Sequence, residues 1–192
     1  GSLRGEVVLL DIWTFSCINC QRTIPYLKYW HAKYKDKGLV IVGLHTPEFA
    51  FEHVLANVER AAKDFGIEYP IVLDNDYSTW NAYGNRYWPR KYLIDPQGYI
   101  IYDHIGEGGY VETERAIQEA LKHRDPSIRF DTQDSSDDTE HTETFQDKSP
   151  EVEFGANRNE YLGNGMKGHT GMETFTVPAD TLLQNTLYFN GA

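Results

Sequence analysis

The stretch Trp-Thr-Phe-Ser-Cys-Ile-Asn-Cys at residues 13–20 decides how the chain is organised. It holds both cysteines of the chain, Cys17 and Cys20, and it follows the apolar run 7–10. A Cys-x-x-Cys that ends a strand and begins a helix places its first sulfur over unpaired backbone N–H groups and the positive end of the helix dipole. Free cysteine titrates near about 8.5, and this environment lowers that pKa, so we predict that Cys17 is a nucleophilic thiolate at neutral pH.

A Cys-x-x-Cys pair can also be half of a zinc site, which requires about four Cys, His or carboxylate ligands. The sequence has no second cysteine pair, and its seven histidines form no His-x(3–5)-His pair that would complete such a site. A purely structural disulfide is the other alternative, but closing so short a loop removes little entropy from the unfolded chain. We therefore predict redox exchange through a Cys17–Cys20 disulfide, with no metal and no further cofactor.

The surroundings of the pair resemble the thioredoxin superfamily. Trp13 lies four residues before the first cysteine, Asp11 six before it, and Pro25 five after the second, as in the active-site strand and first helix of that family. The motif Trp-Thr-Phe-Ser-Cys-Ile-Asn-Cys-Gln-Arg is similar to the active-site sequence of the extracytoplasmic thioredoxin-like domains of the TlpA/ResA kind, and most similar to that of the DipZ kind. The resemblance covers residues 5–124.

This resemblance implies an activity, partners and a compartment. It implies a thiol–disulfide oxidoreductase in which Cys17 attacks a protein disulfide and Cys20 resolves the mixed disulfide. It also implies a membrane electron-transfer partner of the CcdA/DsbD type and an extracytoplasmic location, membrane-tethered or in the cell envelope of a bacterium. No apolar run approaches the ~18–20 residues that span a bilayer, so we expect this piece of chain to be soluble.

Two carboxylates are candidates for accepting the proton of Cys20. Asp11 shares one face of the first predicted strand with Trp13, and burial on a covered face would raise its pKa. Glu48 follows the predicted strand 39–44, and the resemblance to the TlpA/ResA group implies a glutamate near the disulfide at that position. The alternatives are a surface or capping role for Asp11 and a helix N-terminal charge for Glu48.

The dipeptide Trp88-Pro89 precedes the predicted strand 91–94. Thioredoxin-like proteins carry a cis-proline here that faces the cysteine pair. The resemblance therefore implies that Trp13, Trp88 and Pro89 form the substrate-binding groove, where exposed backbone can pair with an extended substrate. The alternative is an ordinary trans proline in a turn.

The order of elements predicts an α/β, thioredoxin-like fold, in which a central mixed β-sheet is flanked by helices. A strand over 6–15, a helix over 18–34 and a strand over 39–44 imply a right-handed parallel crossover. The turn 95–98 predicts that the last two strands are antiparallel. The other expected helices are near 54–65, 78–83 and 111–122, and the other expected strands are near 69–73, 91–94 and 99–105.

The composition changes after the predicted thioredoxin-like domain, residues 1–124. Residues 125–192 carry 4 Lys/Arg and 13 Asp/Glu, and so hold −9 of the total net charge of −11. Residues 125–150 are predicted to be an acidic linker. Residues 151–192 resemble the N-terminal part of a carbohydrate-binding-module-like β-domain and are too few for a whole one, so we expect a truncated β-rich fragment. Lys and Arg do not cluster, which excludes nucleic acid as a partner.

Two other classes of function remain open on the sequence. A thiol peroxidase of the peroxiredoxin type would need a peroxidatic cysteine in its own loop and helix context, which Cys-Ile-Asn-Cys does not resemble. A non-catalytic binding module would use the fold as a scaffold, but two intact cysteines beside Trp13 argue against that use. Substitution of Cys17 by Ser separates the binding module from an oxidoreductase.

Overall fold

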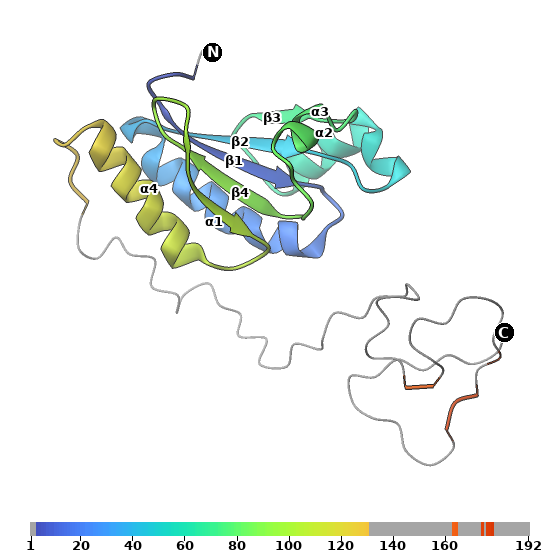
Figure 1. The fold of residues 1–192 in the computed structure, drawn as a ribbon. Helices are drawn as coiled ribbons and strands as arrows, with labels where there is room; N and C mark the ends of the chain where they lie inside the picture. The colour runs from blue at the N-terminus through green and yellow to red at the C-terminus, as the bar shows by residue number, and fades with distance from the viewer. Residues whose placement is uncertain (1–2, 131–162, 165–173, 175, 179–192) are drawn as a thin grey trace. The chain divides into compact units, whose positions relative to one another are not determined.

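The structure is a computed structural model that describes residues 3–130, 163–164, 174 and 176–178 (Figure 1). The chain divides into two units, residues 1–138 and 139–192. The regular elements described here belong to the first unit. The predicted acidic linker and C-terminal β-domain lie mostly outside the described residues and stay predictions.

The described part of the first unit alternates strands and helices along the chain, as the sequence predicts. Its strands are β1 (Val7–Trp13), β2 (Leu39–His45), β3 (Ile71–Leu73), β4 (Arg90–Ile94) and β5 (Ile100–Ile105). Its helices are α1 (Ile18–Tyr34), α2 (Leu55–Asp64), α3 (Ser78–Ala82) and α4 (Tyr110–Arg124), with short 3-10 turns at η1 (Lys35–Lys37) and η2 (Ala50–His53).

The strands form one mixed sheet in the order β3-β2-β1-β4-β5. β1, β2 and β3 are parallel, whereas β4 is antiparallel to β1 and β5 is antiparallel to β4, which confirms the predicted hairpin. The carboxyl ends of the three parallel strands therefore meet the beginning of β4 at one edge of the sheet. Ligands and catalytic groups of open α/β sheets gather at such an edge.

Helices α1 and α4 lie side by side on one face of the sheet (Figure 1). The apolar residues of α1 recur at helical spacing and form a stripe, and each member of this stripe is buried. Full burial of one such side chain contributes about 1.5–3 kcal/mol, so this layer holds α1, and with it the cysteine pair, firmly against the sheet. The stripe consists of Ile24, Leu27, Trp30 and Tyr34. The last three pack with Leu9, Ile41, Ile117 and Leu121, whereas Ile24 packs with Trp13 and Cys20.

The other face of the sheet is packed by α3. Trp80 of this short helix lies in a cluster with Leu10 and Ile12 of β1 and Tyr92 of β4. Because side chains alternate between the two faces of a strand, the odd residues 7 and 9 of β1 face α1 and α4, and the even residues face α3. The strand β1 is thus covered on both sides, as its apolar run 7–10 predicts.

Candidate active site

The first cysteine lies at the N-terminus of α1. Cys17 is the N-cap residue of the helix, and its Sγ accepts a hydrogen bond from the backbone N–H of Cys20 at 3.3 Å. Its side chain is half-buried. A hydrogen bond from the Cys20 thiol, helped by the backbone N–H groups of Cys20 and Asn19, lowers the pKa of Cys17 against the opposing effect of burial. Cys17 is therefore the sulfur that more readily forms a thiolate.

The second cysteine is shielded. Cys20 is 1% exposed and packs in a cluster with Trp13 and Ile24. Burial, above all, raises the pKa of its thiol, and the neighbouring charges of Cys17 and Asp11 raise it further. Its deprotonation therefore needs a nearby base.

Asp11 lies beneath Cys20 in the middle of the sheet. It faces Gly43 of β2 and Lys91 of β4 in the strand register, and it is 2% exposed. Burial raises the pKa of Asp11 to about 7, although the charge of Lys91 acts in the opposite direction. Its Oδ1 atom has no hydrogen-bond partner within the described residues. The carboxyl group can therefore exchange a proton near neutral pH.

Glu48 lies beyond the end of β2 and is exposed. Partial burial and the charge of Glu52 raise its pKa. The charge of Glu48 raises the pKa of Cys17, whereas the charge of Asp11 raises that of Cys20. The two carboxylates named from the sequence thus act on different sulfurs.

Trp88 and Pro89 lead into β4 at the same edge of the sheet. The peptide bond between them is cis, as predicted. Pro89 is buried, and the half-buried Trp88 packs against the cluster of Trp13 and Cys20. The indole Nε1 of Trp88 donates to the Thr46 carbonyl oxygen at 3.0 Å, which ties the start of β4 to the end of β2.

Trp13, named from the sequence as a substrate-binding residue, is only 1% exposed. Its indole therefore lies beneath the surface in this structure, and its role in substrate binding stays a prediction. A Cβ atom on Gly43 would come within 3.0 Å of the Trp13 Nε1 and 3.2 Å of the ring of Tyr69. The indole of Trp13 thus packs beneath the site, in a space that is free because Gly43 has no side chain.

Sequence reasoning missed a buried carboxylate beside the cysteine loop. Glu52, in the turn η2, is fully buried, and its Oε1 accepts a hydrogen bond from the Ser16 hydroxyl at 2.5 Å. Its Oε2 accepts from the backbone N–H groups of Glu48 at 2.6 Å and Phe49 at 2.8 Å. Burial opposes ionisation, but hydrogen bonds, from Ser16 and Thr14 foremost, lower the pKa of Glu52. A glutamate that reaches back to the N–H at the start of a turn is a signal that could have found it.

His45, at the end of β2, was also missed. The ring is fully buried and stacks on Phe15, with 5.7 Å between the ring centroids. Its Nε2 accepts a hydrogen bond from the backbone N–H of Phe15 at 3.3 Å, so the proton of the neutral ring is on Nδ1. Burial lowers the pKa of His45 to about 4. The histidine therefore supports the cysteine loop as an uncharged ring.

Two features are absent from the described residues. No group of three or more His, Cys, Asp or Glu side chains in this part of the chain could hold a metal ion. Within the same residues, no helix has the length and the apolar character needed to cross a membrane.

Comparisons with known proteins agree with this arrangement. DipZ of Mycobacterium bovis is 43% identical over 190 residues, which are 99% of this chain but 27% of DipZ. The thiol-disulfide oxidoreductase ResA of Bacillus thuringiensis is 28% identical over 120 residues, 62% of this chain and 64% of ResA. A solved structure from Chlorobium tepidum that carries the name thiol:disulfide interchange protein DsbE matches with a TM-score of 0.58 and 26% identity, over 62% of this chain and 83% of that one.

Nearly the whole of this chain matches DipZ, but the match spans only about a quarter of the length of DipZ. The Redoxin family model matches residues 1–121, which contain the whole sheet and both cysteines. The chain belongs to the Redoxin family, with a thioredoxin-like fold.

Proposed function

We propose that this domain is a thiol–disulfide oxidoreductase that exchanges electrons with protein thiols and disulfides through Cys17 and Cys20. One observation carries the proposal: a half-buried sulfur with a lowered pKa caps α1, and a shielded sulfur lies one turn into the helix. The name of the relative ResA, thiol-disulfide oxidoreductase, supports the same activity.

In the reducing direction, the Cys17 thiolate attacks one sulfur of a substrate disulfide. A mixed disulfide forms, and the other substrate sulfur leaves as a thiolate. The Cys20 thiolate then attacks the Cys17 sulfur, which forms the Cys17–Cys20 disulfide and releases the second substrate sulfur. The substrate gains two electrons and the cysteine pair loses two, and the oxidising direction is the reverse of these steps.

We further propose that Asp11 accepts the proton of Cys20 before the second attack. The carboxyl group has a pKa of about 7, close to the value that suits a base at neutral pH, and its charge acts on the Cys20 thiol. Glu48 is the second candidate that the sequence offers, and its charge acts on Cys17 instead. We therefore assign the transfer of the Cys20 proton to Asp11 and a modulating role at Cys17 to Glu48.

The substrate polypeptide would lie along the edge of the sheet where β4 begins. Trp88 packs against the cluster that holds the cysteine pair, Pro89 follows it in the chain, and the half-buried indole offers apolar contact. We propose a membrane electron-transfer partner of the CcdA/DsbD type and an extracytoplasmic location, which the similarity to DipZ and ResA supports.

Redox equilibration with glutathione tests the activity. The wild-type chain should form and lose the Cys17–Cys20 disulfide reversibly as the ratio of oxidised to reduced glutathione changes. Cys20→Ser should accumulate a mixed disulfide with glutathione, whereas Cys17→Ser should not, because the shielded sulfur reacts slowly. Limited treatment with iodoacetamide should label Cys17 first.

Two results would overturn the proposal. Reversible oxidation that persists in Cys17→Ser would exclude Cys17 as the attacking sulfur. Rapid consumption of hydrogen peroxide, together with failure to exchange with glutathione, would instead favour a peroxidase.

A further inference from the structure

Two phenylalanine rings stand half-exposed next to the cysteine loop. Phe49 is 50% and Phe51 49% exposed, and their rings are stacked, with 5.7 Å between centroids and 5° between planes. Phe51 also contacts Phe15 edge-on at 5.8 Å, and Phe15 stacks in turn on the buried His45. We call Phe49 and Phe51 the aromatic ridge. A row of rings thus runs from the interior, through the loop that carries the cysteines, to the surface.

A single carboxylate fixes the ridge to that loop. Glu52 accepts hydrogen bonds from the backbone N–H groups of Glu48 and Phe49 and from the hydroxyl of Ser16, the residue before Cys17. Burial of a carboxylate is costly unless hydrogen bonds compensate for it, and here they do. The chain therefore uses a buried charge to hold two rings that remain in contact with water.

Packing of the core does not account for the ridge, because a half-exposed ring recovers only part of its possible burial energy. Its position does suggest a role. It lies next to the cysteine loop, because Phe51 contacts Phe15 and Glu52 accepts the hydrogen bond of Ser16, the residue before Cys17. Ile18, inside the Cys-x-x-Cys motif, is also 56% exposed. Apolar groups therefore flank the attacking sulfur, and contiguous exposed apolar groups mark interaction sites.

We propose that the aromatic ridge binds a large apolar or aromatic side chain of the substrate polypeptide, close in sequence to the cysteine that Cys17 attacks. The inference rests on the proposed oxidoreductase activity and adds a substrate preference to it. Exchange brings the substrate cysteine to Cys17, and consecutive residues of an extended chain are ~3.3 Å apart, so neighbouring side chains pass the ridge. Glu52 is a positioning residue, which acts through the ridge and Ser16.

Two peptide disulfides test the preference. Both are disulfide-linked dimers of a short Gly/Ser peptide with one cysteine, and they differ only in whether Phe or Ser stands two residues before it. Reduced wild-type chain should react with the Phe peptide roughly five- to tenfold faster, the effect of one aromatic anchor at an interface. The readout is the ratio of the two second-order rate constants, followed by tryptophan fluorescence.

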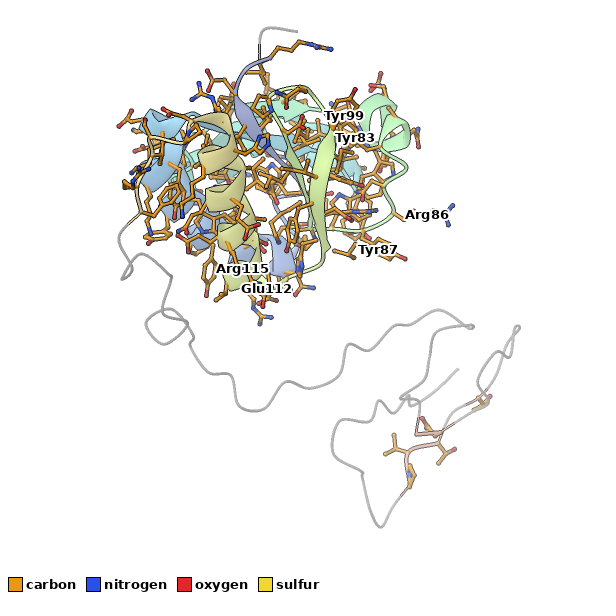
Figure 2. The ribbon with its side chains drawn as sticks, turned by 60° about the vertical axis from the view of Figure 1, so that its left-hand side comes forward. Tyr83, Arg86, Tyr87, Tyr99, Glu112 and Arg115 are labelled. Carbon is orange, nitrogen blue, oxygen red and sulfur yellow. The ribbon has the colours of Figure 1, made fainter. Side chains whose placement is uncertain are left out.

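The ratio should fall to about one in the double variant Phe49→Ala/Phe51→Ala. Tyr99→Ala is the matched control, because Tyr99 is an exposed aromatic residue in the turn after β4, at the end of that strand away from Pro89 (Figure 2). It should keep the wild-type ratio. The single variant Phe49→Ala, which should lower the ratio part of the way, replaces the double variant if the latter does not fold.

Glu52→Gln should also lower the ratio of the Phe peptide to the Ser peptide. A residue with a merely structural role would slow both peptides equally and leave the ratio unchanged. Glu52→Asp, which restores the charge, should recover part of the preference. An unchanged ratio in Glu52→Gln would overturn the positioning role.

The outcomes distinguish a failure of the aromatic ridge as a substrate site from a failure of the oxidoreductase activity. Failure to reduce either peptide overturns the oxidoreductase activity itself. Equal rates for both peptides in the wild type, or a preference that survives in Phe49→Ala/Phe51→Ala, overturn the ridge while the activity stands. A wild-type dimer in analytical ultracentrifugation that the double variant loses would assign the ridge to a second copy of the chain and overturn it as a substrate site.

Discussion

Two buried carboxylates lie near the cysteine pair, one in the sheet and one in the turn η2, and they differ in protonation. Asp11, in the sheet beneath Cys20, has an Oδ1 atom without a hydrogen-bond partner in the described part of the chain, and burial raises its pKa to about 7. Glu52, beside Ser16, receives three hydrogen bonds, and its pKa is lowered despite full burial. Burial alone therefore does not decide the charge of a carboxyl group, because the donors around it can reverse the effect.

The difference suits two tasks. A group that titrates near neutral pH can take and return a proton, whereas a group that stays ionised serves as a fixed anchor. The effects on stability are also opposite in sign. The raised pKa of Asp11 means that stability should fall as pH rises from its unfolded-state value of 3.8 to about 7. The lowered pKa of Glu52 gives stability that is present above 4.5 and lost as pH falls through the lower folded-state value.

The largest effect is expected from Asp11→Asn. Resolution of the mixed disulfide should slow about 100-fold, at the lower end of what a positioned base contributes. The wild-type rate should rise with pH through about 7, and the variant should lose this inflection. Stopped-flow fluorescence of the mixed disulfide between Cys17 and glutathione measures the rate. Glu48→Gln is the matched control and should keep the inflection, because its charge acts on Cys17. The same rate and inflection in Asp11→Asn would remove Asp11 from the proton transfer.

The role of Glu52 as an ionised anchor is tested by Glu52→Gln. We expect the free energy of unfolding at neutral pH to fall by about 2 kcal/mol, because an amide leaves buried donors without an acceptor. Urea titrations near neutral pH and at decreasing pH below 4.5 should show that the deficit shrinks in acid, because Glu52 of the unfolded wild-type chain takes up a proton before Glu52 of the folded chain does. An equal deficit at both pH values would mean that the shape of the side chain matters and its charge does not.

A smaller effect is expected from the hydroxyl that the anchor binds. Ser16→Ala removes one hydrogen bond to Glu52 and should lower the free energy of unfolding by about 1 kcal/mol. Ser127→Ala is the matched control: its hydroxyl donates to Asp125 at 2.7 Å, but on the exposed surface, where such bonds contribute little. Thermal unfolding of both variants is the measurement. Equal losses of stability in the two variants would show that the hydrogen bond from Ser16 to the buried carboxylate contributes no more than a hydrogen bond on the exposed surface.

The smallest effect concerns the partner of Asp11. Lys91 is fully buried opposite Asp11, and its positive charge lowers the pKa of that carboxyl group against the effect of burial. Lys91→Met should therefore move the inflection of the resolution rate to higher pH without abolishing it. The pH profile from stopped-flow measurements shows the direction. A shift to lower pH would mean that Lys91 does not act on Asp11 through its charge.

The sequence was sufficient for the fold and for one of the two carboxylates. Asp11 interrupts an apolar strand at a fixed distance from Cys17, so local periodicity already predicts its burial. The helix 18–34 was also predicted with the bounds that the structure gives, since its apolar stripe follows the helical period. These features depend on neighbours in sequence.

Glu52 depends on contacts that the sequence does not display. Its partner Ser16 lies 36 positions away, and the 3-10 turn η2 directs Glu52 inward while Glu48 stays exposed. Neither a helical nor a strand period indicates which side chain of such a short turn is buried. The burial of Trp13 could not be predicted for a similar reason: the space for its indole depends on Gly43, which lies in the neighbouring strand.

His45 bears on how the site would respond to acid surroundings. Histidine commonly gains a charge between about pH 5 and 8, and many proteins use this change as a switch. Burial lowers the pKa of His45 to about 4, so mild acidification leaves its ring neutral. No new positive charge then arises beneath Phe15 and the cysteine loop. The electrostatic environment beside the cysteine loop therefore stays the same at this position when the surroundings become mildly acidic.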